Sequence, residues 1–323
     1  DEAIALLHEI IFMPNVENDG FKNDIVEQEK RQLENKINAI YDNKILYANE
    51  RLIEEMYKDE PYAIKADGYI EDLTSIDGKN LYEYYKQALT SDDFDLYVLG
   101  DFDENEMKQK VTKLFSRDIK RISNSDESER VKQSVNEVNK IVEKDQISQA
   151  KLHIGYRTNC VYKDKLYSAL QVFNGLFGGF PNSRLFINVR EKHSLAYYVS
   201  SRIESHVGML IVFSGVETSE HERTYTIIEE QFNDLRNGNF TEAELQNVKD
   251  LIISNVKETL DSPIGTIELL YQQVVGETEL PPEQFIDNIR AVTKEAVMEA
   301  AKQIELDTIY VLASEAGDID GEN

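Results

Sequence analysis

The side chains most able to hold a metal ion or act as nucleophiles in this chain are its histidines and its cysteine. The chain has five histidines, at His8, His153, His193, His206 and His221. No two of them are four residues apart, and neither H-E-x-x-H nor its inversion H-x-x-E-H occurs. Cys160 is the single cysteine, which excludes an intrachain disulfide and a cysteine-based zinc site. This chain alone therefore supplies no histidine pair for a metal, and we expect Cys160 to be a packing residue.

One segment combines cationic and phenolic donors, and it reads S-R-L-F-I-N-V-R-E-K-H-S-L-A-Y over residues 183–197. It follows a glycine-rich stretch at residues 175–181, which we expect to be a tight turn that needs positive φ. Arg190 carries a guanidinium and Tyr197 a phenol, and both groups can donate hydrogen bonds. The alternative is that Arg190 pairs with a local carboxylate and Tyr197 packs in a strand.

The elements that must position these residues follow from hydrophobic periodicity. Helical spacing predicts helices at residues 1–12, 23–57, 80–89, 104–115, 163–177, 183–192, 219–236 and 242–260. Asp42 and Asn43 are expected to bend or break the second of these helices, and Thr293 to cap another. Alternating apolar residues predict strands at residues 94–100, 150–156, 196–203, 209–216 and 308–313.

The length of 323 residues suggests about two domains. A faint internal repeat supports this, since each half ends with a helix, a short acidic turn and a strand, the last two at residues 92–103 and 305–318. We therefore predict an α+β fold with two related domains, each a mixed sheet with helices packed on one face. The expected boundaries are a first domain at residues 1–120, a linker at 121–147 and a second domain at 148–323. The chain begins without methionine, so we expect the first domain to be incomplete.

The formal net charge of −26 argues against binding to nucleic acid or to an anionic membrane surface. No apolar run is long enough to span a membrane, and the start lacks the basic flank of a signal peptide. A single cysteine fits a reducing compartment. We therefore expect a cytoplasmic protein.

Several short motifs resemble the pitrilysin/insulinase family of zinc peptidases. In the second half they are a glycine pair, an S-R-L-F run, an R-E-K run and an A-Y pair, at residues 178–179, 183–186, 190–192 and 196–197. In the first half, residues 3–14 and 21–37 are similar to the end of the family's N-terminal domain. The resemblance implies two domains closed like a clam shell around a chamber for unfolded peptide. It also implies that Arg190 and Tyr197 hold the substrate backbone and support the oxyanion.

The same resemblance places Glu29 at the position of an assisting glutamate and Lys36 at the position of the third zinc ligand. A protonated lysine has no lone pair for Zn²⁺, so its ammonium would instead neutralise Glu29 or neighbouring carboxylates. Because a helix turns about 100° per residue, one stripe facing the interior or a cleft contains Glu29, Leu33, Lys36 and Ile40. In a slipped register Glu34 would be the ligand, but it lies about 200° away round the helix.

The resemblance implies a non-catalytic peptidase-like subunit, with no catalytic residue and no cofactor of its own. It would bind peptide or unfolded polypeptide, or act as a scaffold for an active zinc peptidase that is either a paralogue or a second copy. The alternative is a zinc metalloendopeptidase whose histidine ligands lie upstream, and a third possibility is a structural module that binds no peptide. A narrower resemblance, at residues 68–76, 80–87 and 189–203, is to a Gram-positive bacterial subgroup associated with elongation factor P modification.

Overall fold

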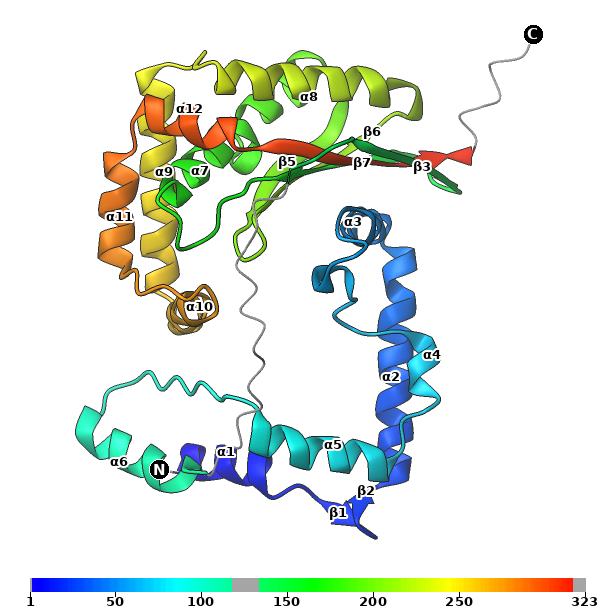
Figure 1. The fold of residues 1–323 in the computed structure, drawn as a ribbon, viewed down its shortest axis with the longest axis vertical. Helices are drawn as coiled ribbons and strands as arrows, with labels where there is room; N and C mark the ends of the chain where they lie inside the picture. The colour runs from blue at the N-terminus through cyan, green and yellow to red at the C-terminus, as the bar shows by residue number, and fades with distance from the viewer. Residues whose placement is uncertain (1, 118–133, 316–323) are drawn as a thin grey trace. The chain divides into compact units, whose positions relative to one another are not determined.

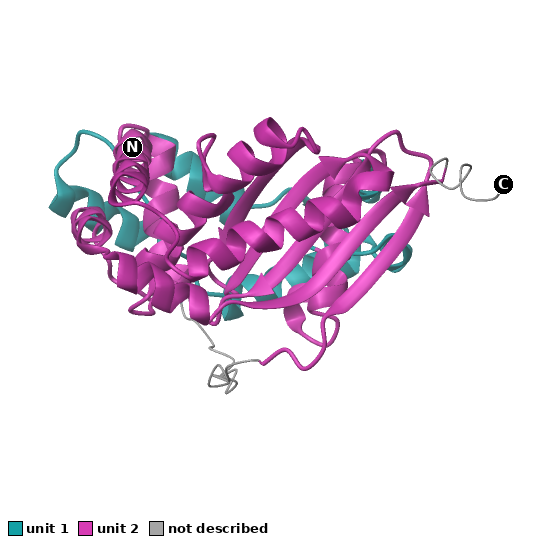
Figure 2. Ribbon diagram, turned by 90° about the horizontal axis from the view of Figure 1, so that it is seen from above, with its two compact units in different colours: residues 1–40, 66–131 teal, residues 41–65, 132–323 magenta. Residues whose placement is uncertain are grey.

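Two compact units make up the chain in a computed structural model that describes residues 2–117 and 134–315. Figure 2 shows unit 1, residues 1–40 and 66–131, and unit 2, residues 41–65 and 132–323. The domain boundaries predicted from the sequence, at residues 120 and 147, differ from these. Residues 41–65 precede both expected boundaries, but they pack with the second half of the chain.

Unit 2 is built on a five-stranded mixed sheet with the strand order β3-β7-β4-β6-β5. In this order the strands are Asn139–Asp145, Glu305–Ser314, Ala150–Arg157, Met209–Val216 and Ala196–Glu204. β3 runs parallel to β7, and the other neighbouring pairs are antiparallel. β4, β6 and the second half of β7 are almost continuously buried, because side chains on both faces of the sheet are covered. The four strands predicted in this half of the chain are confirmed.

Strand β3 lies in the segment that the sequence analysis expects to be an exposed linker. It reads N-K-I-V-E-K-D, and it pairs with β7 along its whole length. As an edge strand it can keep charged side chains in water, so a charged sequence does not distinguish it from a linker. The part of the expected linker before residue 134 lies outside the described residues.

Helices cover one face of this sheet and share one apolar core with it (Figure 1). They are α7 (Tyr167–Asn174), α8 (His221–Arg236), α9 (Glu242–Leu260), α11 (Pro282–Ala291) and α12 (Lys294–Lys302). Helix α10 (Pro263–Val275) packs on α9 and buries none of its residues fully. The cap at Thr293 is confirmed, since its side chain accepts a hydrogen bond from the Ala296 N–H. The sequence analysis does not predict α10 and α11.

A single helix from the first part of the chain, α3 (Lys44–Met56), packs on the opposite face of the sheet (Figure 1). Its residues Ala48 and Leu52 are buried against the side chains of Tyr310 and Leu312 on β7. A Cβ on Gly155 would lie 2.7 Å from the Met56 sulfur, so this glycine permits the close approach of helix and sheet. The expected break is confirmed, since α2 (Asn23–Asp42) ends before Asn43, which caps α3.

Unit 1 is mainly helical over its described residues. Besides most of α2, it contains α1 (Glu2–Phe12), α4 (Ile70–Leu73), α5 (Gly78–Ser91), α6 (Glu104–Phe115), and a ribbon of β1 (Val16–Glu17) and β2 (Gly20–Phe21). The strand predicted at residues 94–100 is wrong, because these residues form no strand. A strand requires a hydrogen-bonded neighbour, and the described part of unit 1 pairs only β1 with β2.

The α+β class is confirmed by the mixed sheet of unit 2 and the helices around it. No helix within residues 2–117 and 134–315 is long and apolar enough to cross a membrane.

Candidate functional site

The first candidate position lies on α2, within unit 1. Glu29, Leu33 and Lys36 line one cavity of about 870 Å³, as their helical spacing predicts. Ile40 and Glu34 are not among the residues that line it. Glu34 does not line the cavity because its side chain lies on another side of the helix.

Lys36 forms an ion pair with Asp67, which follows α3 in the chain and belongs to unit 1. The Nζ–Oδ1 distance is 2.6 Å, and the Lys36 side chain is 66% exposed. The ammonium therefore pairs with a neighbouring carboxylate and not with Glu29. Because its protons point to a carboxylate, Lys36 has no lone pair to offer a metal.

The side chains in the described parts of the chain do not fit a zinc site. Zinc in proteins takes three or four ligands from histidine, cysteine and carboxylate side chains. Among residues 2–117 and 134–315, no group of three such side chains lies close enough together to hold a metal ion. At the position that the resemblance gives to the third ligand, the structure has a cation in an ion pair.

The second candidate region lies in unit 2 and begins with the glycine-rich stretch. The predicted positive-φ turn is wrong, since Gly175–Gly179 form a wide π-helical turn and Gly175 has φ of −60°. A Cβ on Gly175 would lie 2.4 Å from Val248, and one on Gly178 would lie 2.5 Å from the Ser201 hydroxyl. These glycines are therefore required by close packing and not by backbone conformation.

The S-R-L-F run that follows has a structural role. Ser183 and Leu185 are buried. Arg184 pairs with Glu244 at 2.7 Å and donates a hydrogen bond to the Asn239 carbonyl at 3.0 Å. These contacts fix the start of the next helical segment against α9.

Arg190 lies in that segment, the π-helical residues Phe186–Lys192. Its guanidinium lies over the Phe186 ring, 4.8 Å from the ring centre, and the side chain is exposed. No carboxylate among the described residues forms an ion pair with Arg190. The alternative of a local ion pair therefore finds no support.

Tyr197 lies at a β-bulge in β5, which is an edge strand of the sheet. The register shifts between Ala196 and Tyr198, and a bulge of this kind turns a side chain out of the regular pleat. Tyr197 is 54% exposed, and its hydroxyl donates a hydrogen bond of 2.5 Å to Glu217. This hydrogen bond and the carboxylate charge raise the pKa of the Tyr197 phenol. Within the described residues, no hydrogen bond or ion pair joins Tyr197 to Arg190.

Comparison with known proteins decides the family. Residues 75–252, more than half of the chain, match the family described as "Peptidase M16 inactive domain". The chain belongs to the M16 peptidase family.

Several relatives support this assignment. The M16 chain is 45% identical over 320 residues to "Probable inactive metalloprotease YmfF" of Bacillus subtilis (strain 168), a match that covers 98% of the chain and 74% of that protein. It is 25% identical over 295 residues to "Uncharacterized zinc protease YmxG" of the same organism, and this match covers 85% of the chain and 68% of that protein. A conserved protein of Enterococcus faecalis V583 has a crystal structure that matches with a TM-score of 0.87 and 32% identity over 98% of this chain and 75% of that one. The resemblance to the pitrilysin/insulinase peptidases is thus confirmed.

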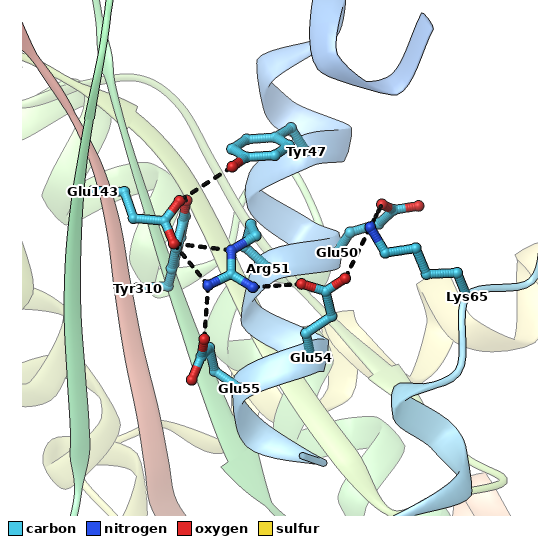
Figure 3. Close-up of polar contacts among 8 residues, drawn as sticks. All are labelled: Tyr47, Glu50, Arg51, Glu54, Glu55, Lys65, Glu143 and Tyr310. Atoms are coloured by element: carbon cyan, nitrogen blue, oxygen red, sulfur yellow. Dashed lines mark hydrogen bonds and ion pairs between the residues drawn. The ribbon is translucent and has the colours of Figure 1, made fainter. Parts of the chain in front are cut away.

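Sequence reasoning missed a polar cluster in unit 2 of this M16 chain, shown in Figure 3. Arg51 on α3 donates two hydrogen bonds to Glu143 on β3, at 2.9 and 2.7 Å. It also pairs with Glu54 and Glu55, while the Tyr47 and Tyr310 hydroxyls donate to Glu143 at 3.2 and 2.8 Å. We call Tyr47, Arg51, Glu54, Glu55, Glu143 and Tyr310 the Arg51 cluster.

The Arg51 cluster joins α3 to the sheet by charge. Burial of Glu143 opposes its ionisation, but hydrogen bonds from Arg51 and Tyr310 outweigh burial and lower the pKa of this carboxyl. Arg51, Glu54 and Glu55 show helical spacing in the sequence, which signals local pairs. The sequence has no signal for Glu143, because its contact with α3 spans 92 residues.

Proposed function

We propose that this M16 chain is a non-catalytic peptidase-like subunit that binds polypeptide or acts as a scaffold for an active zinc-peptidase partner. The observation that carries the proposal is the ion pair of Lys36 with Asp67, at the position that the resemblance gives to the third zinc ligand. A cation there repels a divalent metal and cannot coordinate it. The name of the relative YmfF, "Probable inactive metalloprotease", supports the loss of catalysis.

Arg190 and Tyr197 are the proposed polypeptide contacts. Both side chains are exposed, and the guanidinium has no carboxylate partner among the described residues. The Arg190 guanidinium can donate to a peptide carbonyl, and the Tyr197 hydroxyl can do so when it exchanges its hydrogen bond to Glu217 for one to the peptide. The partner would be an M16 paralogue or a second copy of this chain. A cytoplasmic location rests on the single cysteine, and a link to elongation factor P modification rests on the narrower resemblance.

Metal content and peptidase activity of the full-length protein test the loss of catalysis. We expect no stoichiometric zinc by elemental analysis and no cleavage of a fluorogenic unfolded polypeptide. Stoichiometric zinc, together with cleavage that is lost in Arg190→Ala, would instead establish the zinc endopeptidase.

Binding of a labelled, unfolded polypeptide tests the second half of the proposal, with fluorescence anisotropy as the readout. We expect Arg190→Ala and Tyr197→Phe to weaken binding. Arg223→Ala is a matched control, because Arg223 is an exposed arginine paired with Glu220. No binding by the wild type, together with co-purification of an M16 partner, would identify a structural module without polypeptide binding.

A further inference from the structure

A cavity of about 330 Å³ lies among α7, α9, α10 and α11 of unit 2, away from the residues discussed so far. Aromatic rings of Tyr162, Tyr167, Phe180 and Phe285 form much of its wall. This volume is at the lower end of the range of ligand pockets, about 300–1,000 Å³. The cavity can therefore admit one large side chain or a small molecule.

The lining of this cavity is uncharged. None of its fifteen residues is Asp, Glu, Lys, Arg or His, although 30% of the chain is charged. A charged group that entered would lose its hydration and find no opposite charge. The cavity therefore selects an uncharged group.

Four side-chain amides line the cavity, and two of them have hydrogen-bond partners in the protein. Gln171 donates to the Ser205 hydroxyl at 3.5 Å, and Gln272 contacts Glu268 and His206. Asn255 is exposed at the rim of the cavity and Gln273 is half-buried, and neither side chain makes a hydrogen bond to another described residue, so both can be offered to a ligand. Each carries two N–H donors and one carbonyl acceptor, which complement the C=O and N–H of a peptide bond.

The aromatic wall is held in place before any ligand arrives. The Tyr167 hydroxyl is 3.3 Å from the Ser205 hydroxyl, and the Tyr167 ring centre is 4.8 Å from that of Tyr162. The Tyr162 ring in turn lies 4.9 Å from His206, which hydrogen-bonds to Gln272 on α10. A wall fixed in this way loses little conformational entropy on binding.

We propose that this cavity receives an aromatic or large apolar side chain of a bound polypeptide, while Asn255 and Gln273 hydrogen-bond the backbone amides beside it. The proposal rests on the polypeptide-binding function proposed above, and it names the part of the polypeptide that is recognised. An uncharged, aromatic-walled space with two unfilled amides fits such a residue better than it fits a charged metabolite.

Fluorine NMR with the full chain tests the cavity, using the blocked peptide acetyl-Gly-(4-fluoro-Phe)-Gly-amide as the probe. We expect the fluorine line to broaden with wild-type protein. Competition by acetyl-Gly-Phe-Gly-amide should exceed that by the matching alanine and aspartate peptides. Gln273→Glu places a charge in the half-buried part of the lining and should weaken binding about tenfold, which equals 1.4 kcal/mol. Asn255→Asp removes amide donors at the exposed rim and should weaken binding less. Asn247→Asp is the matched control, since Asn247 is exposed on the same helix and does not line the cavity.

The possible outcomes separate the cavity from the general function. Equal binding by wild type, Asn255→Asp and Gln273→Glu would overturn the cavity proposal, and so would equal competition by the alanine peptide. An unchanged fluorine line would also overturn it. Unfolded polypeptide that still binds in an Arg190-dependent manner would then leave the proposed function intact. If neither the probe nor unfolded polypeptide binds, the cavity proposal and the polypeptide-binding part of the proposed function both fail.

Discussion

Residues 95–100 and residues 308–313 read D-L-Y-V-L-G and T-I-Y-V-L-A and share the run Y-V-L, but they have different structures. The second copy is the end of β7, between β3 and β4, and its Leu312 is 1% exposed. The first copy forms no strand, and the matching Leu99 is 54% exposed. Both segments contain the strand-forming run Y-V-L, but only the second has neighbouring strands to pair with. The first also carries Asp95 and Gly100, residue types that are depleted in strands.

The same contrast separates the two units. In unit 1, α1 and α6 bury none of their residues fully. Even apolar side chains of α1, such as Leu6 and Ile10, are exposed. In unit 2, helices of similar amphipathicity contribute to a continuous core with the sheet. Apolar periodicity therefore predicts that a helix forms, but burial depends on the sheet that the helix packs against.

Paired leucine substitutions should give the largest difference between the two copies. Leu312→Ala removes a fully buried side chain and should lower the free energy of unfolding by about 2–5 kcal/mol. Leu99→Ala removes an exposed side chain and should change it by at most about 0.5 kcal/mol. Urea unfolding followed by circular dichroism measures both changes. Similar losses in the two variants would show that residues 95–100 are buried as β7 is.

A buried histidine makes the stability of unit 2 depend on pH. His153 on β4 is fully buried, and neither ring nitrogen has a hydrogen-bond partner among the described residues. Burial, and then the charges of Lys151 and Arg202, lower the pKa of His153 to about 3. Since an unfolded histidine has a pKa of about 6.5, only the unfolded state binds a proton between these values. The free energy of unfolding should therefore decrease as the pH is lowered through that window, by about 1.4 kcal/mol per pH unit.

Two variants separate the charge of His153 from its polarity. His153→Leu and His153→Gln both remove the titrating group, so the stability that each gains over the wild type should grow from pH 7 to pH 4. Only His153→Leu removes the unsatisfied polar atoms, and it should be more stable than His153→Gln at pH 7 by about 1–3 kcal/mol. Urea unfolding at several pH values measures both effects. A pH-independent difference between His153→Leu and the wild type would contradict the neutral, buried state.

Local patterns in the sequence predict much of the fold and less of the candidate site. The break at Asn43, the cap at Thr293 and four strands of the sheet follow from capping residues and alternation. β3 is not predicted because an edge strand can be highly charged. A strand is wrongly predicted at residues 94–100 because their own sequence does not show whether a neighbouring strand is present. The stripe of Glu29, Leu33 and Lys36 follows from helical periodicity. Asp67 and Glu143 do not, because each meets its cationic partner through folding of distant segments.

The smallest expected difference is between one ion pair of unit 2, Arg51 with Glu143, and one of unit 1, Lys36 with Asp67. Arg51→Met leaves Glu143, Glu54 and Glu55 without their guanidinium in a half-buried setting, and should cost about 1–3 kcal/mol of unfolding free energy. Lys36→Met removes a pair whose lysine is mostly exposed, and should cost about 0–1 kcal/mol. Urea unfolding at 0.1 and 1 M NaCl measures both. Salt should reduce the stability of the wild type relative to Lys36→Met, since it screens exposed pairs more than buried ones. A larger loss in Lys36→Met than in Arg51→Met would mean that the Lys36–Asp67 pair is central to the stability of unit 1.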